Sequence, residues 1–113
     1  MSSTELAPNS RSHARPMVWR GRSGRCYTLM PEGRENFVLD GADLYLIAKD
    51  DDVRWVGTAG DLIDDHASRQ RFRSAVAEAS AIFRMPSPRD DLTRMTIAWD
   101  LEAGERMSEL TAA

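Results

Sequence analysis

The stretch from Asp43 to Leu62, which reads DLYLIAKDDDVRWVGTAGDL, constrains the possible fold more than any other part of the chain. Two short apolar runs, Leu44–Ala48 and Val53–Gly57, flank the charged residues Asp50–Asp52. Apolar runs of this length favour strands, and three consecutive aspartates favour a loop rather than a packed ladder. The sequence therefore predicts a β-hairpin with its tip at Asp50–Asp52. Thr58–Gly60 then forms a turn that leads into a helix.

Length and composition indicate one globular domain. The chain has 113 residues, of which 42% are hydrophobic and 29% charged, which is ordinary for a soluble protein. No apolar run approaches the roughly 18 residues of a membrane span, and the N-terminus has no apolar signal region. Cys26 is the single cysteine, which excludes an intramolecular disulfide and a cysteine zinc site. We expect a cytoplasmic protein with no contact with a membrane.

The segments before the hairpin are less regular. Residues 1–16 are polar and serine-rich, with Arg11 and Arg15 among them, and predict a disordered basic tail. Arg25–Met30 has the β-branched and aromatic bias of a strand. A basic tail is also a candidate arm for nucleic acid or an acidic partner.

The segments after the hairpin predict a helix, a strand and a second helix. The first helix begins near Asp61 and runs to about Ser80, and Ala81–Met85 follows as a third strand. Ser87 with Pro88 is a helix start signal. We expect the second helix to end at Gly104 and to bury an apolar stripe made of four side chains: Leu92, Met95, Trp99 and Ala103.

These elements together predict an α+β fold. We expect a small mixed sheet of three to four strands with two packed helices. The single domain spans residues 17–104, and residues 105–113 form a C-terminal tail.

The central stretch resembles the GIY-YIG nuclease superfamily. Domains of that family carry a Gly-Ile-Tyr-like tripeptide on one strand and a Tyr-Ile-Gly-like tripeptide on the next, and Asp43–Tyr45 and Trp55–Gly57 stand at the matching separation. The turn Thr58–Leu62 also fits the family pattern, and the resemblance covers about Arg25 to Glu102. It implies a GIY-YIG-like fold and cleavage of phosphodiester bonds with a divalent cation.

The residues that would carry this chemistry are mostly replaced. Tyr45 matches the first tyrosine of the family, but Trp55 stands in place of the second, and an indole is neither a base nor an acid. Asp65 occupies the place of the phosphate-binding arginine, and Ala98 that of the metal-binding glutamate. Loss of the cation and the metal ligand removes most of the stabilisation of the transition state. The resemblance therefore implies a catalytically degenerate domain that needs no cofactor and holds no metal.

The favoured hypothesis is a binding or regulatory module for a protein partner or for nucleic acid. The net charge of −3 argues against a protein that coats DNA non-specifically. The candidate binding residues are Arg11, Arg15, Arg20, Arg22, Trp55, Arg69 and Arg73.

Two alternatives stay open. The first is an active Mg²⁺- or Mn²⁺-dependent endonuclease with relocated ligands, which would use Tyr45, Arg69 and a carboxylate from Glu78, Asp91 or Asp100. The second is an unrelated small α+β interaction domain. Tyr45 and Trp55 on strands that are not adjacent would establish this second alternative.

Overall fold

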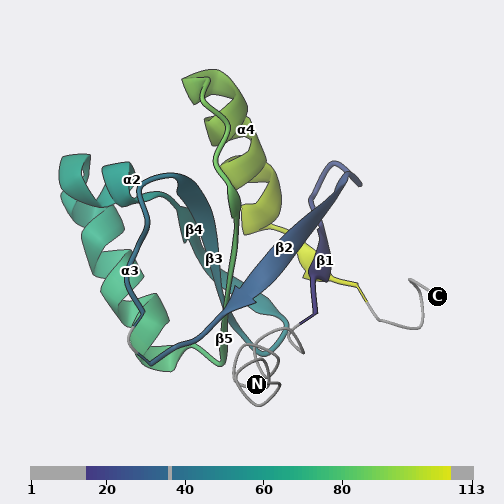
Figure 1. Cartoon of the computed structure of the whole chain (residues 1–113), viewed down its shortest axis with the longest axis horizontal. Helices are drawn as coiled ribbons and strands as arrows, with labels where there is room; N and C mark the ends of the chain where they lie inside the picture. The colour runs from purple at the N-terminus through teal and green to yellow at the C-terminus, as the bar shows by residue number, and fades with distance from the viewer. Residues whose placement is uncertain (1–14, 36, 108–113) are drawn as a thin grey trace, which may run out of the picture.

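The fold is a six-stranded antiparallel sheet with three helices (Figure 1). The computed structural model describes residues 15–35 and 37–107, and all counts here refer to those residues. The sheet order is β4-β3-β5-β2-β1-β6, and every neighbouring pair is antiparallel. The elements in chain order are β1 (Met17–Arg20), β2 (Cys26–Glu32), β3 (Asp43–Lys49), β4 (Asp52–Gly57), α2 (Ala59–Asp64), α3 (His66–Glu78), β5 (Ala81–Pro86), α4 (Asp91–Glu102) and β6 (Glu105–Arg106).

The predicted mixed sheet of three to four strands with two packed helices is wrong. The apolar residues near Trp19 form β1, which pairs with β2 across the turn at Gly21–Gly24. Glu105 and Arg106, expected in a tail, pair with β1 as β6. The predicted first helix is two helices, because Asp65 leaves the helical conformation and caps α3 by accepting a hydrogen bond from the main-chain nitrogen of Ala67 at 3.1 Å.

The sheet curls into a nearly closed barrel. β2 belongs to both halves, because its first part pairs with β1 and its last three residues pair with β5. The two outer strands approach each other at one point, where Arg106 Nε of β6 lies 4.0 Å from Asp51 Oδ1 in the turn before β4. α4 stands beside the sheet and contacts β4 (Figure 1).

Alternation along the strands creates two apolar cores. Leu44 and Leu46 of β3 point to the inner face, where they pack with Trp19, Phe83 and Leu101 of α4. The outer-face core is covered by α3 and consists of Tyr45, Ile47, Trp55, Ala75, Ala79 and Ile82. β3 is therefore buried on both faces, as its continuous apolar run predicted.

The second predicted helix is present, but its start and its buried face differ from the prediction. α4 begins at Asp91, and its N-cap is Asp90, whose carboxylate accepts from the main-chain nitrogen of Thr93 at 2.7 Å. Leu101 is fully buried, and Ile97 packs against the inner core. The three large side chains of the predicted buried stripe face outward instead: Leu92, Met95 and Trp99.

None of the helices in the described ranges combines the length and the apolar character needed to cross a membrane.

Candidate functional site

The two aromatic residues at the family-like positions lie inside the protein. Tyr45 is 1% exposed, and its hydroxyl accepts a hydrogen bond from the main-chain nitrogen of Asp40 at 2.7 Å. Burial raises the pKa of Tyr45, although the hydrogen bond from Asp40 opposes this effect. The Tyr45 hydroxyl is therefore neutral at physiological pH and already has a hydrogen-bond partner.

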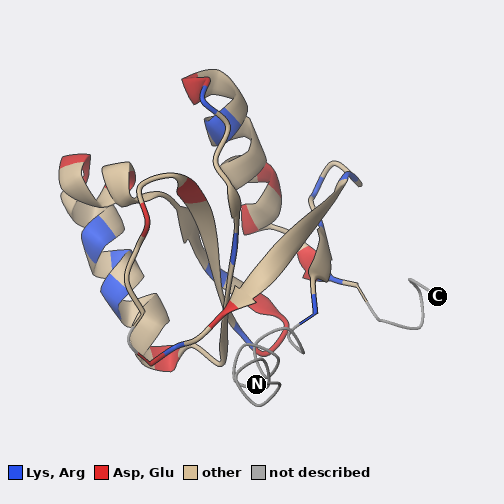
Figure 2. Cartoon of the chain, in the orientation of Figure 1, with Lys and Arg blue, Asp and Glu red and all other residues tan. Residues whose placement is uncertain are grey.

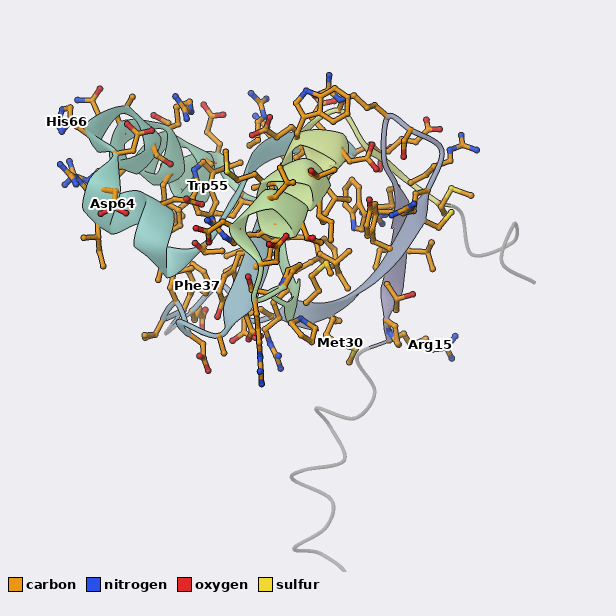
Figure 3. The ribbon with its side chains drawn as sticks, turned by 90° about the horizontal axis from the view of Figure 1, so that it is seen from above. Arg15, Met30, Phe37, Trp55, Asp64 and His66 are labelled. Carbon is orange, nitrogen blue, oxygen red and sulfur yellow. The ribbon has the colours of Figure 1, made fainter. Side chains whose placement is uncertain are left out.

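Trp55 is buried under α3 (Figure 3). Its indole nitrogen donates to Ser68 Oγ at 3.2 Å, and its ring meets Phe72 edge to face with the ring centroids 4.9 Å apart. Trp55 and Tyr45 lie on adjacent strands, where Gly57 is the cross-strand partner of Tyr45. The two tripeptides are therefore neighbours in space, but their aromatic side chains are parts of the core.

The guanidinium of Arg69, a candidate binding residue, is hydrogen-bonded to the main chain of its own domain. Its guanidinium donates to the main-chain oxygens of Leu62 at 2.8 Å and Ile63 at 3.3 Å, at the end of α2. The last carbonyls of a helix have no partner within the helix. Arg69 therefore satisfies two of these acceptors.

The three candidate carboxylates do not come together. Glu78 on α3 lies 3.8 Å from Arg54, Asp91 at the start of α4 pairs with Arg94 at 3.1 Å, and Asp100 lies near the other end of α4. Across residues 15–35 and 37–107, no three His, Cys, Asp or Glu side chains are grouped as a metal ion would require.

The candidate binding arginines come from different elements, and Figure 2 shows the basic residues of the described ranges scattered among acidic ones. Arg11 lies outside the described residues, and Arg15 precedes β1 at its exposed end (Figure 3). Arg20 forms an ion pair with Glu105, and Arg73 is exposed on α3. These side chains do not form one basic surface.

Arg22 belongs to a contact between the β1–β2 turn and α4, and we call this contact the anchor at Asp100. It donates to the main-chain oxygen of Trp99 at 2.9 Å and stacks over the Trp99 ring at 3.9 Å. Beside it, the carboxylate of Asp100, which is 3% exposed, accepts three hydrogen bonds of 2.7 Å. The donors are Ser23 N, Ser23 Oγ and Tyr27 Oη.

The Asp100 carboxylate is a structural group. Burial opposes its ionisation, but the hydrogen bonds from Ser23 and Tyr27 outweigh burial and hold the pKa of Asp100 below its ordinary value. The turn passes so close that a Cβ on Gly21 would lie 2.4 Å from the carboxyl carbon. Glycine is therefore required at position 21 for the turn to close over Asp100.

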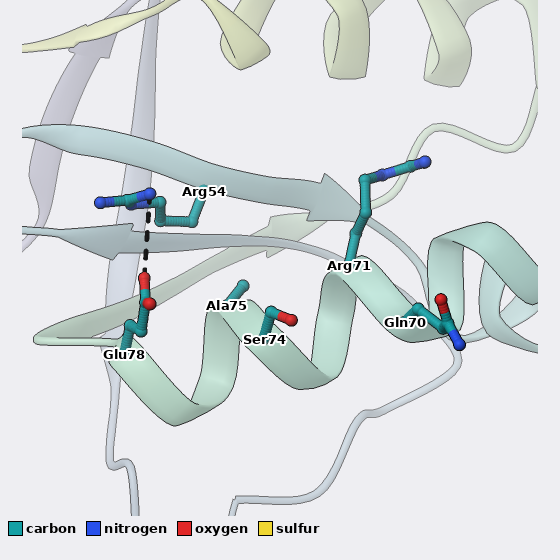
Figure 4. A pocket seen from close by; sticks show the side chains of 6 residues that line it. All are labelled: Arg54, Gln70, Arg71, Ser74, Ala75 and Glu78. Atoms are coloured by element: carbon teal, nitrogen blue, oxygen red, sulfur yellow. Dashed lines mark ion pairs between the residues drawn. The ribbon is translucent and has the colours of Figure 1, made fainter.

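Shared lining residues link several hollows along β4 and between α3 and α4, and we call this set of hollows the β4 groove. It consists of three adjoining hollows of about 340, 340 and 220 Å³, each of which has Arg71 in its wall. The first, shown in Figure 4, lies between α3 and β4 and includes the pair of Arg54 and Glu78. The other two are lined in addition by Val53, Trp55, Val56, Asp61, Asp65, Ser68, Arg94, Met95, Ala98, Trp99 and Glu102.

Arg71 is the available cation of this groove. Arg54 lies near Glu78, and Arg94 pairs with Asp61 at 3.4 Å and with Asp91. No hydrogen bond or ion pair joins the Arg71 guanidinium to another described residue. Its side chain extends past the end of β4, away from the Arg54–Glu78 pair (Figure 4).

The outward stripe of α4 borders the same groove. Leu92, Met95 and Trp99 are 73%, 60% and 53% exposed, and their spacing of three and four residues places them on one helix face. Met95 and Trp99 line the hollow between α3 and α4. The sequence analysis identified this apolar stripe and predicted that it is buried. Periodicity alone does not tell whether an apolar stripe packs against the protein's own core or against another molecule.

No protein-family model matches the chain, and no significant similarity to a curated protein or to a solved structure was found.

Proposed function

We propose that this protein is a non-catalytic binding module for a protein partner, and that the β4 groove and the adjoining stripe of α4 form its interface. The observation that carries the proposal is the exposure of Leu92, Met95 and Trp99 on one helix face beside a groove. Contiguous apolar side chains rimmed by polar residues are typical of interaction sites. Aromatic residues and Met are also enriched in the cores of such interfaces.

The charges of the groove favour a protein over nucleic acid. Acidic side chains outnumber arginines along its walls: Asp61, Asp65, Glu78 and Glu102 against Arg54, Arg71 and Arg94. Affinity for nucleic acid depends mainly on neutralising phosphates with cations. A groove with mixed charges repels a phosphate backbone along much of its length, but it suits a peptide of mixed composition.

We also propose that the β3–β4–α2 unit derives from a GIY-YIG-type scaffold whose chemistry has been lost. Tyr45 and Trp55 on adjacent strands support the relationship. The Tyr45 hydroxyl is hydrogen-bonded to the main chain of Asp40, and the Arg69 guanidinium is hydrogen-bonded to the end of α2. Neither group is free to act on a substrate, which supports the loss of chemistry. A cytoplasmic location belongs to the same proposal, because an exposed lone thiol at Cys26 suits a reducing compartment.

Affinity capture from the native host tests the binding function. The full chain is compared with a Leu92→Glu/Met95→Glu variant and with Val38→Glu, a control at a position that is 75% exposed and does not line the groove. We expect at least one captured protein to be lost with the α4 variant and kept with the control. Equal capture by all three chains, or capture that nuclease treatment abolishes, would contradict the proposal.

A plasmid-nicking assay tests the loss of chemistry. The full chain is incubated with supercoiled DNA and Mn²⁺, beside Tyr45→Phe and Arg69→Ala. We expect no nicking above the level of a buffer control. Nicking by the wild-type chain that both substitutions abolish would instead support the active endonuclease.

A further inference from the structure

We propose that the outward stripe of α4 binds a segment of the partner protein that is both apolar and basic. The apolar side chains of that segment pack on the stripe, and its lysines or arginines face the carboxylates that border the stripe. This inference rests on the proposed protein-binding function and specifies the chemistry of the ligand. It follows from the excess of acidic residues around an exposed apolar helix face.

Five carboxylates border the stripe, and we call them the acidic margin. Asp91 immediately precedes Leu92 in α4, and Glu102 lies about one helical turn beyond Trp99. The other three belong to α2 and to the break before α3, across the hollows from α4. The acidic margin consists of Asp61, Asp64, Asp65, Asp91 and Glu102.

These carboxylates line two hollows that share part of their walls. One hollow has a volume of about 220 Å³ and is lined by Met95 and Trp99 of the stripe. The other has a volume of about 260 Å³ and lies between α2 and the start of α4. Asp61 and Arg94 line both hollows. The apolar stripe and the acidic margin are therefore neighbours on the surface.

Negative charge is in excess beside the stripe. The two hollows contain five carboxylates against two arginines, Arg71 and Arg94, whereas the β4 groove as a whole contains four carboxylates and three arginines. Arg94 already pairs with two of the carboxylates. Arg22 covers one face of the Trp99 ring, and even with Arg22 included the acids outnumber the bases. The surface around the stripe is therefore more acidic than the rest of the groove.

This charge decides among the molecules that could cover an apolar helix face. Faces of this kind bind protein segments or lie on membrane surfaces. The cytoplasmic face of a membrane and the backbone of nucleic acid are both negatively charged, and the acidic margin repels them. A protein segment with Lys or Arg beside its apolar residues complements both parts of the surface. Complementary charges across an interface also favour the correct partner over others.

Selection from a library tests the chemistry of the ligand. Random peptides of roughly fifteen residues, enough for about four helical turns, are displayed on phage and selected on the full chain at low salt. We expect the enriched peptides to combine a net positive charge with several large apolar residues. The affinity of a synthetic copy should fall at least about fivefold between roughly 0.05 M and 0.5 M salt, because salt screens ion pairs at a surface.

Reversal of two charges of the acidic margin tests the basic part of the ligand. Asp64 and Glu102 are the last residues of their helices, where a positive charge is favourable, so Asp64→Lys/Glu102→Lys should fold normally. We expect this variant to bind the peptide at least about tenfold more weakly. Glu35→Lys/Asp52→Lys makes the same change in net charge at two exposed carboxylates that line none of these hollows. It should leave affinity within about twofold.

Truncation of the stripe without a change in charge tests the apolar part. Leu92→Ala/Met95→Ala removes side chains that are 73% and 60% exposed, so it should affect binding rather than folding. We expect at least about tenfold weaker binding, the scale of one interface hot spot. Val38→Ala truncates an equally exposed side chain outside the stripe and should change affinity less than about twofold. Circular dichroism confirms that each variant is folded.

The outcomes separate this inference from the proposed function. Enriched peptides that are neutral or acidic, or that respond equally to the two lysine double variants, overturn the basic ligand. If those peptides are still lost with Leu92→Ala/Met95→Ala, the stripe binds protein and only the present inference fails. A dimer in sedimentation velocity that Leu92→Ala/Met95→Ala dissolves would assign the stripe to a second copy of the chain and also overturn the inference. An absence of any enriched peptide overturns it as well, and host capture that is insensitive to Leu92→Glu/Met95→Glu overturns the proposed function.

Discussion

Removal of one hydroxyl group from the anchor at Asp100 should destabilise the whole domain. Tyr27 Oη donates to Asp100 Oδ2 at 2.7 Å, and the carboxylate is almost fully buried. A hydrogen bond to a charged group contributes about 1.5–3 kcal/mol. Tyr27→Phe leaves the carboxylate with only the two donors of Ser23. We expect the free energy of unfolding to fall by about 2 kcal/mol, which lowers the melting temperature of a domain of this size by about 8–16 °C.

The size of this loss should depend on pH in a defined direction. The folded-state pKa of Asp100 is lowered, because the hydrogen bonds from Ser23 and Tyr27 outweigh the effect of burial. Its contribution to stability is therefore complete above the unfolded-state pKa of about 3.9 and is lost as the pH falls through the folded-state value. The difference between wild type and Tyr27→Phe should be full at pH 7 and should shrink below about pH 4.

Urea unfolding followed by circular dichroism at pH 7 and pH 3 measures this difference, with Tyr45→Phe as the control. The Tyr45 hydroxyl accepts from the neutral main-chain nitrogen of Asp40, so its loss should cost about 1 kcal/mol and vary little between the two pH values. A Tyr27→Phe variant as stable as wild type at pH 7 would refute the reasoning. A loss that is equally large at pH 3 would also refute it.

Two further substitutions test the packing of the hairpin and of α4. Gly57→Ala places a Cβ 2.7 Å from the Trp55 ring and 2.8 Å from the Asp61 carboxylate, so urea unfolding should show a loss of about 1–3 kcal/mol; unchanged stability would mean that the turn relaxes freely. Leu101→Ala should cost about 2–5 kcal/mol because Leu101 is fully buried, whereas Leu92→Ala should cost less than about 0.5 kcal/mol. Equal losses from these two leucine variants would show that the assigned faces of α4 are wrong.

The central hairpin could be predicted because its signals agree with one another. The apolar runs, the three aspartates and the following turn all point to β3, a tip and β4, and the structure confirms this arrangement. Asp50 adopts a φ of 56°, a left-handed conformation that aspartate tolerates better than most residues. The strand after the helices, β5, is confirmed for the same reason, since a short apolar run there is bounded by turn residues.

The strand count could not be predicted, because the missing strands are short and depend on distant partners. β6 has only two residues, and its pairing with β1 joins segments more than eighty positions apart in the chain. Nothing local marks Glu105 and Arg106 as a strand. The sequence also carries no clear signal for the break between the helices at Asp65, because an aspartate inside a helical pattern lowers helix propensity only slightly.

The candidate site was missed because α4 has apolar residues on two faces. Ile97 and Leu101 share one face, and Leu92, Met95 and Trp99 share the other. Periodicity finds both stripes and cannot choose between them. The choice is made by the Asp100 carboxylate, which the β1–β2 turn holds inside the protein and which thereby fixes the rotation of the helix.

The pairing of β1 with β6 has a consequence for how this domain can be built into larger proteins. The two strands are antiparallel neighbours, and the main-chain nitrogen of Met107 donates to the oxygen of Val18 at 2.9 Å. The chain therefore enters and leaves the fold at the same place. Domains with adjacent ends tolerate circular permutation and insertion into a host loop. A host protein could carry this domain as an insert without a gap in its own backbone, and new ends could be opened at Asp50–Asp52.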